Sequence, residues 1–145
     1  MQHRSIITIA LAFAAILACG HSKPAPTRPE DAVHKIGPNN FQVDRAALKS
    51  LPGGFQSIMK EADIVENKQG GAMLGYRLFR IRPWSVWHML ELRNGDAITH
   101  FDGRPIRTKD DMYELYKKLE DGKEPITLMV QRQANRFRTT VHMQD

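Results

Sequence analysis

Apolar and polar residues alternate with a period of two in three stretches of the chain. These stretches are residues 75–81, 126–130 and 137–141, and a polar turn at residues 133–135 separates the last two. A period of two is typical of strands that bury one face. The pattern therefore predicts a strand over Gly75–Ile81 and a C-terminal hairpin.

Apolar residues spaced by three and four positions predict helices with one buried face. A short helix is expected over residues 55–62, and a longer one starts at Asp110 and ends before Gly122. Two further short helices are expected, over 45–48 and 86–90. Residues suited to N-capping precede three of these segments: Asp44, Ser85 and Thr108.

The first residues have the pattern of a bacterial lipoprotein signal. A basic start is followed by an apolar run over Ser5–Leu17 and by Ile16-Leu17-Ala18-Cys19. The run is too short to span a bilayer, which needs roughly 20 residues, so residues 1–18 are interpreted as a removable signal peptide. Cys19 would then carry the lipid. The alternative is an ordinary signal cut near Ala18 with a stray thiol at Cys19, and both alternatives predict export to the periplasm.

Three segments are expected after the signal. Residues 19–40 contain four prolines and few large apolar side chains, so we expect a semi-extended tether there. Residues 41–66 are expected to be a strand-helix prefix packed on the main module, which covers residues 67–145. Gly20 follows Cys19 in place of a sorting aspartate, which favours the outer membrane over the inner one.

Composition changes this picture little. The formal charge is +5, and Lys and Arg are scattered along the chain, which suits an acidic partner or membrane but is weak evidence for nucleic acid. His88 and His100 do not form a set of three or four ligands such as zinc needs. Ser85 lacks a Gly-x-Ser-x-Gly elbow, and Asp96 is expected to fix a turn. We therefore expect no enzyme, no cofactor, no metal, no nucleic acid and no small-molecule substrate.

Residues 41–145 resemble the periplasmic part of protein C of type II secretion, whose C-terminal module is a PDZ domain. The resemblance rests on a spaced motif in one run of residues: Gly75, Tyr76, Leu78, Phe79, Ile81, Arg82, Pro83, Ser85, Leu92, Gly95, Asp96 and Gly103. It implies an α+β, PDZ-like fold, a partly open antiparallel β-barrel or sandwich with two helices, preceded by the strand-helix prefix.

Two departures from the family limit what the resemblance implies. Glu91 stands where the family has a glycine. A signal and Cys19 stand in place of the family's transmembrane helix and of the region that resembles its secretin contact. Docking to the secretin is therefore not expected to carry over to this chain.

The resemblance also implies a peptide groove, in which an extended peptide pairs with the strand after Leu74, opposite the helix that starts at Asp110. Leu74-Gly75-Tyr76 resembles the carboxylate loop of PDZ domains. The expected groove residues come from the strand and the helix: Leu74, Gly75, Tyr76, Leu78, Tyr113 and Lys117. The alternative is that Tyr76 and Leu78 pack in the core.

The two tryptophans are expected to differ in role. Trp87 falls where the family has an aromatic residue in the short helix, so core packing is expected for it. Trp84 directly follows Pro83 and is the better candidate for a surface contact.

The resulting hypothesis is a lipid-anchored PDZ protein in the periplasm, which binds a secretion component or a secreted substrate. It would be a component or accessory of type II secretion. Two alternatives stay open: a PDZ regulator or adaptor of a periplasmic protease, and a structural lipoprotein with a blocked groove.

Overall fold

A computed structural model describes residues 28–145. Its main feature is a sheet with the strand order β1-β2-β8-β7-β5-β4-β3, and β6 is attached to β5. Neighbouring strands are antiparallel except β2 and β8, which are parallel. The strands are β1 Val33–Gly37, β2 Asn40–Asp44, β3 Asp63–Gln69, β4 Ala72–Phe79, β5 Ala97–Phe101, β6 Arg104–Pro105, β7 Ile126–Arg132 and β8 Asn135–Gln144.

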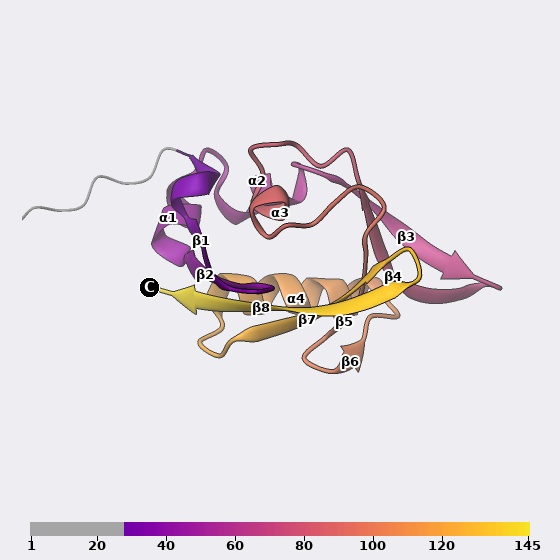
Figure 1. The fold of residues 1–145 in the computed structure, drawn as a ribbon. Helices are drawn as coiled ribbons and strands as arrows, with labels where there is room; N and C mark the ends of the chain where they lie inside the picture. The colour runs from indigo at the N-terminus through magenta and orange to yellow at the C-terminus, as the bar shows by residue number, and fades with distance from the viewer. Residues whose placement is uncertain (1–27) are drawn as a thin grey trace, which may run out of the picture.

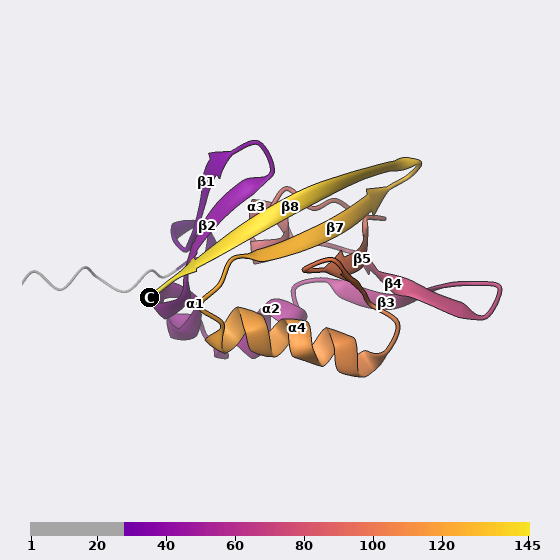
Figure 2. The same ribbon diagram turned by 90° about the horizontal axis from the view of Figure 1, so that it is seen from below.

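The helices are short except for one. They are the 3-10 helix η1 Pro29–Asp31 and the α-helices α1 Arg45–Ser50, α2 Gly54–Met59, α3 Val86–Met89 and α4 Lys109–Asp121. Helix α4 runs alongside the sheet, with α1 and α2 near its C-terminal end (Figures 1 and 2). The mixed α+β fold and the mostly antiparallel, open sheet confirm the predicted fold class.

The core lies between the inner face of the sheet and the helices. Met112 and Leu115 of α4 and Trp87 of α3 are buried against it. The sheet contributes alternate side chains, as a period of two requires: Phe41, Val43, Leu78, Ile98, Phe101, Ile126, Leu128, Val130 and Val141. The alternation seen in the sequence therefore identified the buried faces of β7 and β8 correctly.

Side chains cap the helices where the sequence predicted them. The cap residues are Asp44, Ser85 and Thr108. At α4 the capping box is complete, because Thr108 Oγ1 accepts the Asp111 N–H at 3.2 Å and Asp111 accepts the Thr108 N–H at 2.8 Å. These bonds satisfy N–H groups that have no partner within the helix.

The predicted tether is wrong for residues 29–40. Pro29 begins η1, Val33–Gly37 forms β1, and β1 pairs antiparallel with β2. The prolines suggested a linker, but Pro29 stands at the start of a helix and Pro38 lies in the turn between two strands, where proline is tolerated. Ala32 and Val33 supply the buried side chains that order this segment.

The predicted boundary between a prefix and a module is also wrong. Strand β2 lies parallel to β8, so the N-terminal segment belongs to the main sheet. Strand β3 runs from Asp63 to Gln69 and therefore crosses the boundary expected at residue 66. Segments distant in sequence join one sheet here, which local periodicity does not reveal.

The signal peptide, Cys19 and the tether up to residue 27 lie outside the described residues. Within residues 28–145, no helix is both long and apolar enough to cross a membrane.

Candidate peptide-binding groove

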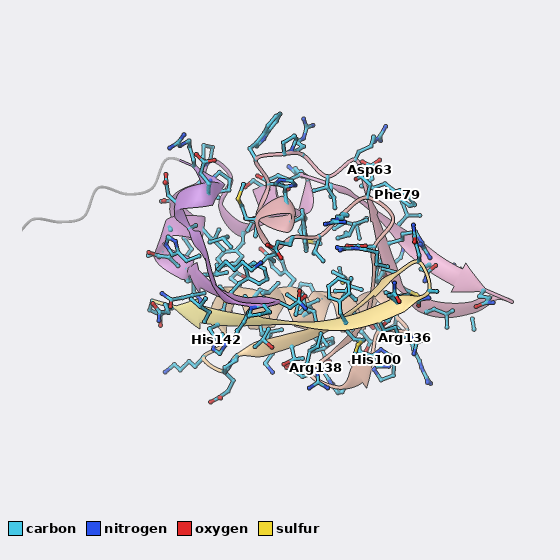
Figure 3. The ribbon with its side chains drawn as sticks, in the orientation of Figure 1. Asp63, Phe79, His100, Arg136, Arg138 and His142 are labelled. Carbon is cyan, nitrogen blue, oxygen red and sulfur yellow. The ribbon has the colours of Figure 1, made fainter. Side chains whose placement is uncertain are left out.

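The open edge of the sheet next to α4 belongs to β3. Strand β4, which the sequence analysis took as the binding edge, is paired on both sides, with β3 and with β5. Strand β3 is the last strand of the sheet path. Figure 3 labels Asp63 and Phe79, which pair across the hairpin where β3 begins and β4 ends. The predicted edge is thus wrong by one strand.

Leu74-Gly75-Tyr76 does not form a loop, because all three residues lie inside β4. Gly75 has a φ of 115°, and a Cβ atom there would stand 2.1 Å from the carbonyl oxygen of Ile98. Glycine is therefore required at this position for the close approach of two strands. The glycine that suggested a carboxylate loop has a structural role within the sheet.

A hollow of about 470 Å³ separates β3 and α4. Two strands, α2 and α4 contribute its lining: Gln56, Met59, Ile64, Tyr76, Lys109, Met112, Tyr113 and Tyr116. The lining is mostly apolar or aromatic, with polar groups at the rim. A hollow of this kind beside an unpaired strand edge is the geometry in which an extended segment adds to a sheet.

The expected groove residues are partly assembled there. Tyr76 and Tyr113 line the hollow, and Tyr113 is 61% exposed. Leu78 is fully buried in the core, which was the alternative considered for it. Leu74 is 41% exposed but does not line the hollow. Lys117 lies outside the lining, and its ammonium group faces Asp121 at 3.7 Å.

Sequence reasoning missed several groove residues. Ile64 falls in the segment that was expected to be a strand-helix prefix, and Met112 and Tyr116 fall in the long helix that was expected to bury its apolar face. Gln56 and Met59 come from α2, a helix that was expected only to pack on the module. The apolar face of α4 could have indicated Met112 and Tyr116, because a broad apolar face also covers the side of the helix that lies towards the edge of the sheet.

The rim of the groove near the start of α4 carries charge. Glu66 of β3 pairs with Lys68, and Lys109 of α4 lies 4.0 Å from the same carboxylate. The hydrogen bond from Lys68 lowers the pKa of Glu66. Burial, and secondarily the charge of Glu66, raises the pKa of Tyr76. The phenol of Tyr76 therefore stays neutral at physiological pH.

The tryptophans occupy the places expected of them. Trp87 is buried and donates its indole N–H to the carbonyl of Ile58 at 2.7 Å. Trp84 is 55% exposed and lies against the guanidinium of Arg82, 5.9 Å from the ring centre. Trp84 lines a different hollow, together with Ser57 and Lys60.

Asp96 fixes its turn and also holds a partner that the sequence did not suggest. It accepts the Arg93 N–H at 2.8 Å, as expected for a turn residue, and pairs with Arg132 of β7 at 2.7 Å. The hydrogen bond with Asp96 raises the pKa of Arg132. Among residues 28–145, no group of three or more His, Cys, Asp or Glu side chains is placed to hold a metal ion.

The order of elements from β3 onward defines the class of the protein. A hairpin, a short helix, two strands, a long helix beside the open strand edge and a final hairpin make a PDZ-like domain. The chain is structurally similar to PDZ domains of type II secretion protein C over about 60% of its length.

Three solved structures illustrate this similarity. The PDZ domain of EpsC from Vibrio cholerae, residues 204–305, is 18% identical, with a TM-score of 0.48 over 60% of this chain and 82% of that one. A shorter form, residues 219–305, is 17% identical, with a TM-score of 0.44 over 59% and 97%. The PDZ domain of pullulanase C protein of the type II secretion system from Klebsiella pneumoniae, in complex with fatty acid, is 25% identical, with a TM-score of 0.40 over 59% and 87%. No protein-family model and no curated protein matches the chain.

Proposed function

We propose that this protein is a non-enzymatic PDZ protein of the bacterial envelope, which binds a protein or peptide as a component or accessory of type II secretion. The observation that carries the proposal is the unpaired edge of β3 beside the apolar hollow under α4. The backbone edge offers hydrogen bonds to an extended segment, and the hollow offers a place for a side chain.

The binding mechanism combines main-chain pairing with one apolar pocket. A partner segment adds as a further strand to β3, and an apolar side chain of that segment enters between Tyr76 and Met112. Tyr113 of α4 is exposed and covers the bound segment from the helix side. Burying one such side chain contributes roughly 1.5–3 kcal/mol, so the pocket selects for an apolar residue at one position.

In this proposal, attachment to a membrane makes binding more effective. A lipid on Cys19 would keep the domain near the bilayer and near other envelope proteins. Tethering raises the effective concentration of a partner on the same membrane, so an intrinsic affinity in the micromolar range suffices.

A comparative pull-down tests the proposal. The full-length protein is cross-linked in its native envelope and purified, and its partners are identified by mass spectrometry. Recovery of secretion proteins, lost in Tyr113→Lys but kept in Trp84→Ala, is the expected result. One variant replaces an exposed aromatic residue inside the groove, and the other replaces one outside it. Recovery of a protease that depends on Tyr113 would favour the role of a protease adaptor, and equal recovery by both variants would contradict binding in this groove.

A further inference from the structure

The direction of the groove follows from its two walls. Lys109, at the start of α4, lies 4.0 Å from Glu66 in the middle of β3. Tyr116, further along α4, packs edge to face on Phe55 of α2 with ring centres 6.4 Å apart. Helix α4 therefore runs opposite to β3, and α2 stands at the end where β3 begins. A segment that adds antiparallel to β3 points its carboxyl end towards α2.

This end of the groove has few donors for a carboxylate. Capture of a free C-terminus needs successive unpaired N–H groups. In the segment Lys60–Ala62, which precedes β3, the Lys60 N–H donates to Ser57 at 3.0 Å and the Glu61 N–H donates to Ile58 at 3.2 Å. Two of the three N–H groups are thus used to end α2.

Cations do not replace the missing donors. Lys60 lines the hollow beside Trp84 and not the groove. Lys117 of α4 is outside the groove lining and faces Asp121. Met59, a neutral side chain at the end of α2, lines the groove. Removing a carboxylate from water without hydrogen bonds is strongly disfavoured. This end of the groove therefore favours the uncharged backbone of a continuing segment over a terminal carboxylate.

Helix α2 is a fixed wall and not a removable lid. Phe55 and Ile58 are buried in the core, and the carbonyl of Ile58 holds the indole of Trp87. Displacing α2 would expose these side chains. Gln56, which is exposed on the rim of the groove, carries an amide that both donates and accepts, which suits the backbone of a segment turning out to solvent.

We infer that the groove between β3 and α4 accepts an internal extended segment of a partner protein and does not capture a free C-terminus. This inference rests on the proposed function. It names the kind of partner: a protein that presents an exposed strand or hairpin with an apolar residue, whatever its terminal sequence.

The inference is tested with two libraries of short random peptides displayed on phage. One library has a free C-terminus, and the other presents the peptides within a loop. Both are selected on the full chain purified from the envelope in detergent, with Tyr113→Lys as the control bait. Enriched peptides are then synthesised with a terminal carboxylate and with a terminal amide, and their dissociation constants are measured.

We expect the loop library to enrich peptides that require Tyr113, and amidation to change affinity by less than about threefold. Enrichment from the free C-terminal library of peptides whose affinity falls more than threefold on amidation would overturn the inference while leaving the proposed function intact. Enrichment from neither library beyond the Tyr113→Lys background would contradict the proposed function, and the inference with it.

Discussion

Gly75 allows strands β4 and β5 to approach each other closely. A methyl group at this position would collide with the carbonyl oxygen of Ile98 at 2.1 Å, and φ at 115° is strained for any other residue. We expect Gly75→Ala to lower the free energy of unfolding by about 2–6 kcal/mol, the sum of backbone strain and overpacking. Urea unfolding followed by circular dichroism measures this change.

Gly71→Ala is the matched control for Gly75→Ala. Gly71 also has a positive φ, 81°, but nothing lies within 4 Å of the added methyl group. The expected loss is about 1–2 kcal/mol, from the left-handed conformation alone. Equal losses for the two variants would contradict the close approach of β4 and β5 at Gly75.

Asp111 makes the stability of α4 depend on pH. The N–H of Arg107, and then the hydroxyl and N–H of Thr108, lower the pKa of its carboxyl. A lowered pKa in the folded state contributes stability above the ordinary carboxyl pKa, which is lost as pH falls through the lowered value. We therefore expect Asp111→Asn to be less stable than the wild type at pH 7 and about equal to it near pH 2.

Urea midpoints across this pH range measure the effect of Asp111. Asp110→Asn is the control, since Asp110 is the neighbouring exposed carboxylate at the start of α4 but is not the residue that closes the capping box. A difference between Asp111→Asn and the wild type that stays constant down to pH 2 would contradict the proposed origin of the pH dependence.

At the scale of elements, one hydrogen bond connects α3 to the helix that closes the groove. Trp87 of α3 donates to the carbonyl of Ile58 in α2 at 2.7 Å. Trp87→Phe removes this hydrogen bond and leaves the Ile58 carbonyl with the backbone N–H of Glu61 as donor, so we expect a loss of about 0.5–1.5 kcal/mol. Trp84→Phe is the control and should stay within about 0.5 kcal/mol of the wild type, because Trp84 is exposed. Similar losses in thermal unfolding for both variants would rule out this role for Trp87.

The sequence predicted individual helices and strands better than it predicted which strands pair with each other. The period of two in β7 and β8 and the caps at Ser85 and Thr108 are local signals, and the structure confirms them. The edge strand was placed wrongly, because alternation identifies a buried face and carries no information on which strand pairs with which. Strand β1 was missed since Val33 and Ile36 are its only large apolar residues.

The same reason explains which of the predicted groove residues lie together and which do not. Tyr76 and Tyr113 were identified through the resemblance to a known family, and the structure brings them to one hollow. Ile64 lies on the adjacent strand, and Met59 on a helix that precedes the recognised motif, so neither carried a signal in the sequence. Their role depends on the pairing of β3 with β4 and on the packing of α2 against α4.

At the scale of the whole molecule, a lipid on Cys19 would determine where the domain works. We expect the mature protein from the envelope to begin at Cys19 and to have a mass increased by attached acyl chains, because the signal ends in Ile16-Leu17-Ala18-Cys19. Intact-mass spectrometry measures this, with Cys19→Ser as the control without lipid. A mature N-terminus elsewhere, or an unmodified Cys19, would contradict the prediction.

Site-specific photocross-linking in living cells tests the central claim, that the groove between β3 and α4 binds another protein. A photoreactive phenylalanine analogue is placed at Tyr113 in the full-length protein, and at Trp84 in a control protein. Both side chains are exposed, at 61% and 55%, but only Tyr113 lines the groove. We predict a discrete cross-linked partner from position 113 and none from position 84. Cross-linking from position 84 alone, or from neither position, would contradict binding at the groove.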